Sequence, residues 1–182
     1  MCCFAGQAAG LLALPFYLQH GLSQSTLLTG LYMTPWPLTV AAVAPIVGRL
    51  ANFSSTAWLC AAGATVLATG LFAAAIMPLQ GEVWPLALFT ALCGLGFGLF
   101  NVPNNRNMFL SAPAIRSAAA GGIQGTARLT GQTSGAVIMT LLLALVQLDM
   151  APRIGLAVGA ALTLAAGFVS LLRVGPTNAA RA

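Results

Sequence analysis

The chain has 182 residues, of which 59% are hydrophobic and only 5% are charged, and its mean hydropathy is +0.92. A water-soluble domain of this length hides about 70% of its unfolded surface and still needs a charged exterior to stay dispersed. The composition therefore excludes a soluble globular fold and indicates a membrane-spanning protein. The net charge of +5 comes from arginines scattered singly between apolar runs, which argues against the clustered basic face of a nucleic-acid-binding protein.

Six apolar runs follow one another, and each approaches or exceeds the roughly 20 residues that a helix needs to cross ~30 Å of hydrocarbon. The runs are apolar on all sides and lack the alternation of a membrane barrel, so the sequence predicts an all-α membrane protein with a six-transmembrane-helix bundle. This bundle would occupy residues 1–174, followed by a short cytoplasmic tail over 175–182. The predicted helices cover residues 3–19, 29–48, 57–78, 84–110, 118–147 and 154–172.

The first two runs contain prolines, which remove an intrahelical hydrogen bond and bend a helix. Pro15 marks either a bend or the outer end of the first helix. The Pro35-Trp36-Pro37 segment predicts a bend in the second helix. No basic segment or small-residue cleavage site accompanies the first run, so we expect it to remain as a helix rather than to be removed as a signal peptide.

The fourth run is interrupted at Pro103, which stands between Asn101 and Asn104. Their amides can satisfy backbone groups freed by the proline, or can face water. The segment is therefore either a bend that lines a cavity or an interfacial helix end. For the nearby Arg106 we favour the helix end.

The fifth run carries the densest set of polar residues, because Gln124, Arg128 and Gln132 recur every four positions and share one helical face. Arg128 would lie about ten residues, or ~15 Å, inside its helix, too far to reach the cytoplasmic surface easily. Two interpretations remain open. Arg128 is either a substrate-anion or gating contact, or a structural arginine that caps carbonyls or pairs with an acid.

Glycines on the same run have small-x-x-x-small spacing, which lets two helix backbones approach closely. The two pairs are Gly121 with Gly125 and Gly131 with Gly135. Helix packing is their expected role.

No residue set suits catalysis or metal binding. The cysteines lack C-x-x-C spacing and a nearby histidine pair, and we interpret them as small hydrophobic residues, with acylation of the adjacent pair as an alternative. They are Cys2, Cys3, Cys60 and Cys93. The single histidine, His20, and the two acids, Glu82 and Asp149, fall at predicted helix ends. We therefore expect neither an enzyme nor a bound cofactor.

The arginines also predict orientation, because cytoplasmic loops are enriched in basic residues. The arginine-poor side would carry Arg153 with His20, Glu82 and Asp149. Both termini would then lie in the cytoplasm, and we expect the membrane to be a bacterial inner membrane. The arginine-rich side would carry Arg49, Arg106, Arg116, Arg173 and Arg181.

Four segments occur in the order Leu14-Pro15-Phe16-Tyr17-Leu18-Gln19, Thr29-Gly30-Leu31-Tyr32-Met33-Thr34-Pro35, Ala44-Pro45-Ile46-Val47-Gly48-Arg49-Leu50-Ala51 and Arg128-Leu129-Thr130-Gly131-Gln132-Thr133-Ser134-Gly135-Ala136. Together they resemble the carboxy-terminal half of a major facilitator superfamily transporter, most closely the fourteen-helix drug:proton antiporter, or multidrug efflux, branch. The resemblance implies two six-helix bundles, each of two inverted three-helix repeats, with a small amphipathic substrate between them and protons as the coupling ion. Only one bundle is present here.

The chain also departs from that family pattern. The cytoplasmic-loop motif is reduced to Gly48 and Arg49, because Asn52-Phe53-Ser54-Ser55 stands where an aspartate and further basic residues are usual. Proton coupling needs a titratable group in the membrane pathway, and neither Glu82 nor Asp149 is placed to serve. A coupling carboxylate would have to come from the missing half or from a second chain.

Three hypotheses follow. The first is a transporter half, incomplete on its own, whose stripe of Gln124, Arg128 and Gln132 faces the missing amino-terminal bundle. The second is a non-transporting membrane interaction module or a homo-oligomeric half-transporter. The third, a membrane-embedded enzyme, ranks far behind because no catalytic set is present.

Overall fold

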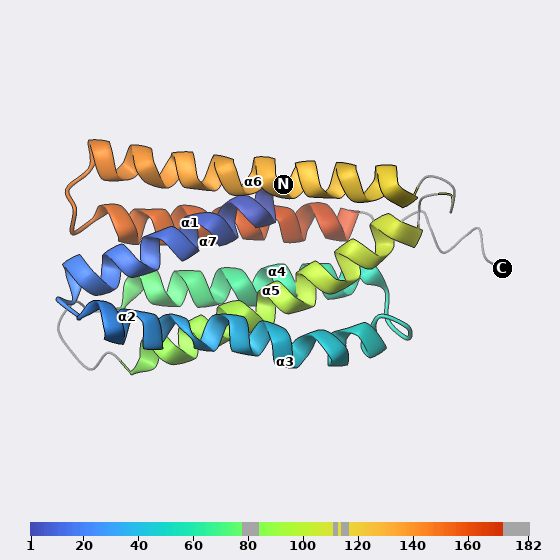
Figure 1. Cartoon of the computed structure of the whole chain (residues 1–182), viewed down its shortest axis with the longest axis horizontal. Coiled ribbons are helices and arrows are strands. Elements are labelled where there is room, and N and C mark those ends of the chain that lie inside the picture. Colours follow the sequence, from blue (N-terminus) through green and yellow to red (C-terminus); the bar gives the residue numbers. More distant parts are fainter. Residues whose placement is uncertain (78–83, 111–112, 114–116, 173–182) are drawn as a thin grey trace.

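The computed structural model describes residues 1–77, 84–110, 113 and 117–172, and this part of the chain forms six helical rods with no strand (Figure 1). The first rod is α1 (Cys2–Phe16) continued by a π-helical turn, η1 (Tyr17–Gly21), and the second is α2 (Thr26–Met33) followed by α3 (Pro35–Leu50). The others are α4 (Thr56–Ile76), α5 (Pro85–Leu110), α6 (Ser117–Leu145) and α7 (Ala151–Leu171). The predicted all-α fold is confirmed. The expected tail over 175–182 lies outside the described residues, as do Glu82, Arg116, Arg173 and Arg181.

Five of the six rods are long and apolar enough to cross a membrane, and α6 is the exception. Its 29 residues make it the longest helix, about 43 Å against ~30 Å of hydrocarbon. The polar residues along it, including Gln124, Arg128 and Gln132, explain its lower hydropathy. The length of α6 affects how deep each of these residues lies.

The prolines act differently in different rods. The second rod is interrupted at Thr34, directly before Pro35, where the sequence predicts a bend in one continuous helix. It begins at Thr26, three residues earlier than expected, because the backbone N–H of Leu28 donates to Ser25 Oγ at 3.3 Å and caps the helix. Pro15 does not end the first rod, since the chain continues through η1 to Gly21, where the wider π-helical turn follows the proline.

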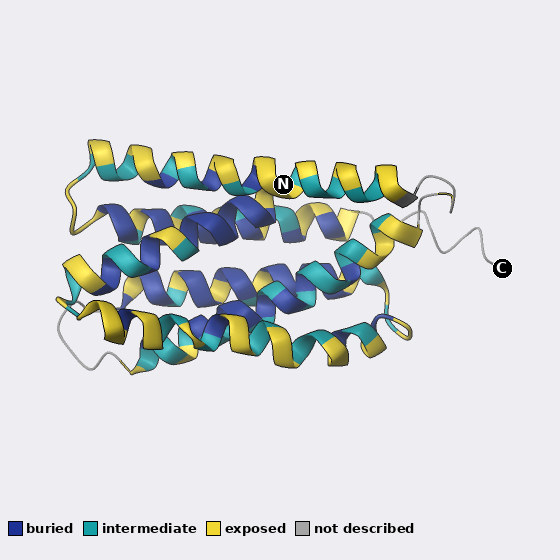
Figure 2. Ribbon diagram, in the orientation of Figure 1, coloured by how far each residue is buried: buried dark blue, intermediate teal, exposed yellow. Residues whose placement is uncertain are grey.

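The helices at the centre of the bundle are the most buried (Figure 2), and glycines bring their backbones into close contact. Gly6 in α1 stands against the backbone of Gly159 in α7, and Gly63 in α4 stands against the backbone of α5 at Gly96. A Cβ atom at any of these positions would overlap the neighbouring helix. Because lipid gives helices no hydrophobic reason to associate, this close packing supplies much of the stabilisation.

Hydrogen bonds to carbonyls at helix ends hold both ends of the bundle. At one end, the Tyr17 hydroxyl donates to the backbone carbonyl of Met77 at 2.8 Å, and the Arg153 guanidinium donates to the same carbonyl. At the other end, Arg106 Nη1 donates to the carbonyl of Ala51 at 2.7 Å, just beyond the end of α3. A cation at a helix C-terminus satisfies orphan carbonyls and complements the helix dipole.

Candidate functional site

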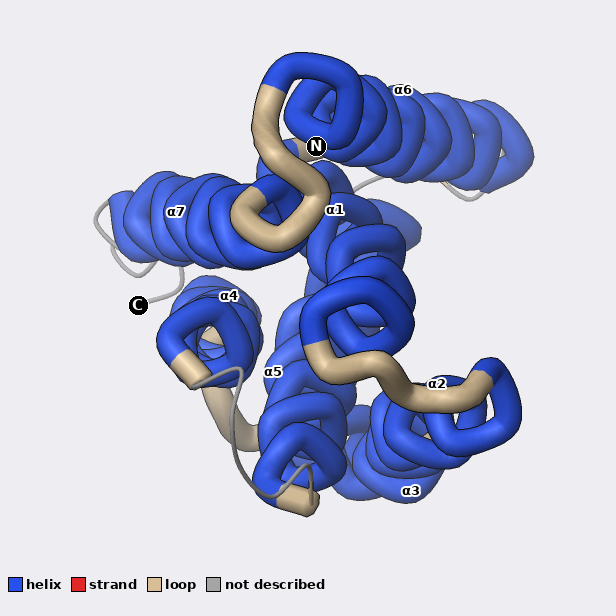
Figure 3. The backbone as a smooth tube through the Cα atoms, turned by 90° about the vertical axis from the view of Figure 1, so that its left-hand side faces the viewer, coloured by secondary structure: helices blue, strands red, loops and turns tan. Residues whose placement is uncertain are grey.

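Two rods, α2–α3 and α6, lie at the periphery of the bundle. Of the most apolar 18 residues of the α2–α3 rod, 11% are buried, compared with 56% for α4. In an end view, α2–α3 and α6 flank α1 and α5 on the side away from α4 and α7 (Figure 3). The described part of the chain thus leaves two helix faces uncovered on the same side of the molecule.

The predicted polar stripe on α6 divides into three environments. Gln124 is half-buried, and its Nε2 donates to Asn105 Oδ1 of α5 at 2.7 Å. Arg128 is exposed, and Gln132 is half-buried. Gln124 therefore joins α6 to its own bundle, which differs from the expectation that the whole stripe faces a partner bundle.

The contact between Gln124 and Asn105 also fixes how α6 is aligned along α5. Arg106 in α5 and Gln124 in α6 each lie about 32 Å along the helix from its other end, a distance close to the thickness of the hydrocarbon core. Arg128 lies four residues, or about 6 Å, further along α6 than Gln124. It stands eleven residues after Ser117, the first residue of α6, which is about 16 Å along the helix axis and agrees with the expected ~15 Å.

Asn101 and Asn104 stand in the part of α5 that passes Pro103 without a break. Both side chains are half-buried. The Asn101 Oδ1 atom is fully buried and has no hydrogen-bond partner among the described residues. A buried polar atom without a hydrogen-bond partner is rare in folded proteins and calls for an explanation.

Gln7 is a polar residue that the sequence analysis missed. It lies in α1, is 7% exposed, and its Oε1 atom is buried without a partner among the described residues. Phe4, one helical turn away, contacts Phe97 and Phe100 of α5 edge-on, with ring centroids 6.2 Å apart in each pair. The available signal was that Gln7 is the one amide in the apolar stretch from residue 2 to residue 18.

The four glycines of α6 fall into two groups. Gly131 stands against Met1 and Phe4, and Gly135 stands against the backbone of Ala5, so both lie where α6 meets α1. Gly121 faces the ring of Phe109, whereas Gly125 has nothing within 4 Å of the position that a Cβ atom would take. Gly131 and Gly135 thus both lie at a close backbone contact between helices, whereas of the other pair only Gly121 faces another helix, through the side chain of Phe109.

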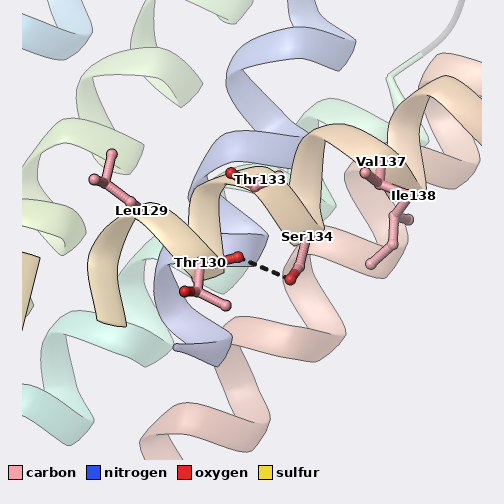
Figure 4. Close-up of a pocket in the computed structure, with 6 residues that line it drawn as sticks. All are labelled: Leu129, Thr130, Thr133, Ser134, Val137 and Ile138. Atoms are coloured by element: carbon pink, nitrogen blue, oxygen red, sulfur yellow. Dashed lines mark hydrogen bonds between the residues drawn. The ribbon is translucent and has the colours of Figure 1, made fainter. Parts of the chain in front are cut away.

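A shallow, open groove runs along the outer face of α6 (Figure 4). The Ser134 hydroxyl donates to the carbonyl of Thr130 at 2.8 Å within the same helix, so it is satisfied locally. The lining residues are Leu129, Thr130, Thr133, Ser134, Val137 and Ile138. Small hydroxyl and aliphatic side chains of this kind suit contact with lipid or with another helix.

The remaining residues singled out from the sequence are the loop-motif remnant at the end of α3 and the four cysteines. Gly48 is half-buried with open space around it, and Arg49 is exposed in the last turn. Cys3, Cys60 and Cys93 are buried, whereas Cys2 is exposed. No group of three or more histidine, cysteine or acidic residues in the described ranges is placed to hold a metal ion.

An all-helical bundle of apolar rods with polar residues held between them has the architecture of an integral membrane protein. The chain is 40% identical over 178 residues to the "uncharacterized transporter YebQ" of Escherichia coli (strain K12), in an alignment covering 96% of the chain and 38% of that protein. It is 28% identical over 126 residues to the "riboflavin transporter RibZ" of Clostridioides difficile (strain 630), covering 69% of the chain and 28% of that protein. The chain therefore spans less than half the length of these curated relatives. No family model matches it, and no solved structure is significantly similar.

Proposed function

We propose that the chain is the carboxy-terminal bundle of a secondary active transporter of the major facilitator type, which moves small amphipathic molecules out of the cell in exchange for protons. The similarity of nearly the whole chain to a protein named as a transporter carries this proposal. The resemblance to the multidrug efflux branch supplies the direction of transport and the coupling ion. The setting is a bacterial inner membrane with both termini in the cytoplasm.

The uncovered faces of α2–α3 and α6 support a second bundle as the natural partner. The α2–α3 face is apolar, the α6 face mixes aliphatic and polar side chains, and both lie on the side of the molecule away from α4 and α7. The curated relatives contain well over half of their length outside the aligned region, enough for further helices. The substrate would then lie between two bundles near the membrane midplane.

Within this bundle, some polar residues would act in gating and others would line the substrate pathway. Gln124 and Asn105 join α5 to α6 near one membrane surface, where a single hydrogen bond can break and re-form as the helices separate. Arg128 and Gln132 follow on the same helical face and would contact an incoming substrate. Asn101 and Asn104 in α5 and Gln7 in α1 would belong to the substrate pathway, since the Gln7 Oε1 and Asn101 Oδ1 atoms have no hydrogen-bond partner among the described residues.

Reconstitution into proteoliposomes with an imposed pH gradient tests the proposal. The chain joined to an amino-terminal bundle, taken from the YebQ protein, should move ethidium or riboflavin and dissipate the pH gradient as it does so. The chain alone should do neither, since its described residues contain no acid within the apolar part of a helix. Transport without any change in the gradient would refute proton coupling, and no transport by the joined protein of either probe would refute the function.

The same uncovered faces favour one alternative, a homo-oligomer in which a second copy replaces the missing bundle. In that case the chain alone would run as a dimer in detergent. It would then either transport by itself or act as a non-transporting interaction module. Mass measurement of the purified chain in detergent, combined with the transport assay above, separates these outcomes.

A further inference from the structure

We propose that the turn between α3 and α4 is a binding site for anionic phospholipid headgroups, formed by Arg49 and Arg106 beside the aromatic rings of Phe53 and Trp58. This inference does not depend on whether the chain transports anything. It concerns a turn that the proposed function leaves without a role.

The first observation is that two exposed arginines belong to this end of α3. Arg49 lies in the last turn of α3, and Arg106 extends from α5 to the residue after that helix, where its Nη1 donates to the carbonyl of Ala51 at 2.7 Å. A guanidinium carries five N–H donors in a planar fork that matches phosphate. The bond to Ala51 fixes the position of Arg106 and occupies one of its nitrogens, so the rest of the exposed guanidinium can meet a headgroup.

The second observation is that aromatic rings project from the same turn. Phe53 is 89% exposed, the highest value among the large hydrophobic residues that the structure describes, and Trp58 in the first turn of α4 is 59% exposed. Exposing a whole phenyl ring to water is unfavourable, whereas aromatic side chains at the membrane interface are stabilised at the headgroup level. The rings thus mark the turn as lying at the lipid surface.

The third observation is charge complementarity. Asp149 is the one acidic residue in the described part of the chain. It lies in the turn between α6 and α7, at the opposite end of the bundle. Among the described residues, no carboxylate therefore competes for Arg49 or Arg106 at their own end. Asn52, Ser54 and Ser55 are also uncharged, so the turn combines positive charge with an apolar ring, which is the pattern that binds acidic lipid surfaces.

The binding preference can be measured from quenching of tryptophan fluorescence by brominated lipids, with the full chain reconstituted in bilayers. Brominated phosphatidylglycerol should quench more strongly than brominated phosphatidylcholine in low salt. Each arginine near the surface contributes about fivefold to the preference. Arg49→Gln and Arg106→Gln should each lower it by about that factor, and the preference should fall as salt screens the charges.

Matched variants separate charge from folding. Arg49→Lys and Arg106→Lys should keep most of the preference, and Asn52→Gln, a neutral change in the same turn, should leave it unchanged. Equal quenching by the two lipids, or an unchanged preference in both glutamine variants, would overturn the proposal.

Inorganic phosphate at millimolar concentration should not displace the lipid, and displacement would show a site for free anions instead. If another protein segment covers the turn, joining the amino-terminal bundle should abolish the quenching. That result would also overturn the proposal.

Discussion

Arg128 and Arg106 show how differently two arginines of the same sequence can be used. Arg106 donates to the carbonyl of Ala51 and ties α5 to the end of α3. Arg128 is exposed, and no hydrogen bond from it to a described residue is present. The spacing of the α6 residues predicts that Arg128 shares a face with Gln124 and Gln132, but it does not predict which partner each residue has.

This difference gives a paired prediction. Arg106→Ala should lower the stability of the bundle by about 1 to 3 kcal/mol, because it removes a charge-assisted hydrogen bond and leaves a helix-end carbonyl unpaired. Arg128→Ala should change the stability by less than about 0.5 kcal/mol, since the side chain is exposed. In the joined protein, Arg128→Ala should nevertheless reduce transport. Thermal unfolding in detergent and proteoliposome transport measure the two effects, and equal destabilisation by both variants would contradict the assignment.

Gln7 allows a second test at this scale. Its Oε1 atom is buried without a partner among the described residues, so Gln7→Leu removes a desolvated acceptor and should leave the melting temperature unchanged or raise it. Thr90 is the matched control, because its buried hydroxyl donates to the carbonyl of Tyr32 at 2.9 Å. Thr90→Val should therefore lower stability by about 1 kcal/mol. A large loss of stability in Gln7→Leu would show that Gln7 has a structural role.

At the scale of single helices, the rods are held together by small residues that let backbones meet. Gly63 and Gly96 join α4 to α5, and Gly131 and Gly135 meet α1. Small-x-x-x-small spacing predicts close packing without showing which pairs are used. Gly125 has the same spacing but stands in open space.

A comparison of two glycine variants tests this contact. Gly96→Ala places a methyl group inside the backbone of α4 near Leu67, and we expect overpacking to cost about 1 to 3 kcal/mol. Gly30→Ala in α2 meets nothing within 4 Å, and alanine should stabilise that helix by up to about 1 kcal/mol. Thermal unfolding in detergent compares the two. Equal melting temperatures would show that the α4–α5 contact is looser than described.

At the scale of the whole molecule, the arrangement of rods determines which faces are free. α1 lies against α6 and α7, and α4 lies against α5 and α7, which leaves α2–α3 and α6 at the edge. A partner bundle should therefore contact these two rods. It should not contact the outer surfaces of α4 and α7.

Site-specific photo-crosslinking tests that prediction. Benzoylphenylalanine placed at Leu38 in α3 or Val137 in α6, which are 62% and 51% exposed, should crosslink to a co-expressed amino-terminal bundle. The same amino acid at Phe168 in α7, which is 64% exposed, should crosslink to lipid and not to that bundle. Crosslinks from Phe168 alone would place the partner on the opposite side and contradict the proposed assembly.

The sequence by itself determined the solvent and the secondary structure of this protein. Long apolar runs can satisfy their backbone hydrogen bonds within lipid only as helices, so the helices and a distortion near Pro35 could be predicted. Only the tertiary structure decided the pairing of Gln124 with Asn105 and the burial of Gln7. The physical reason is that helical periodicity gives the face on which a residue lies, whereas its depth and its partners depend on how neighbouring helices are aligned along their axes. That alignment comes from packing between distant segments.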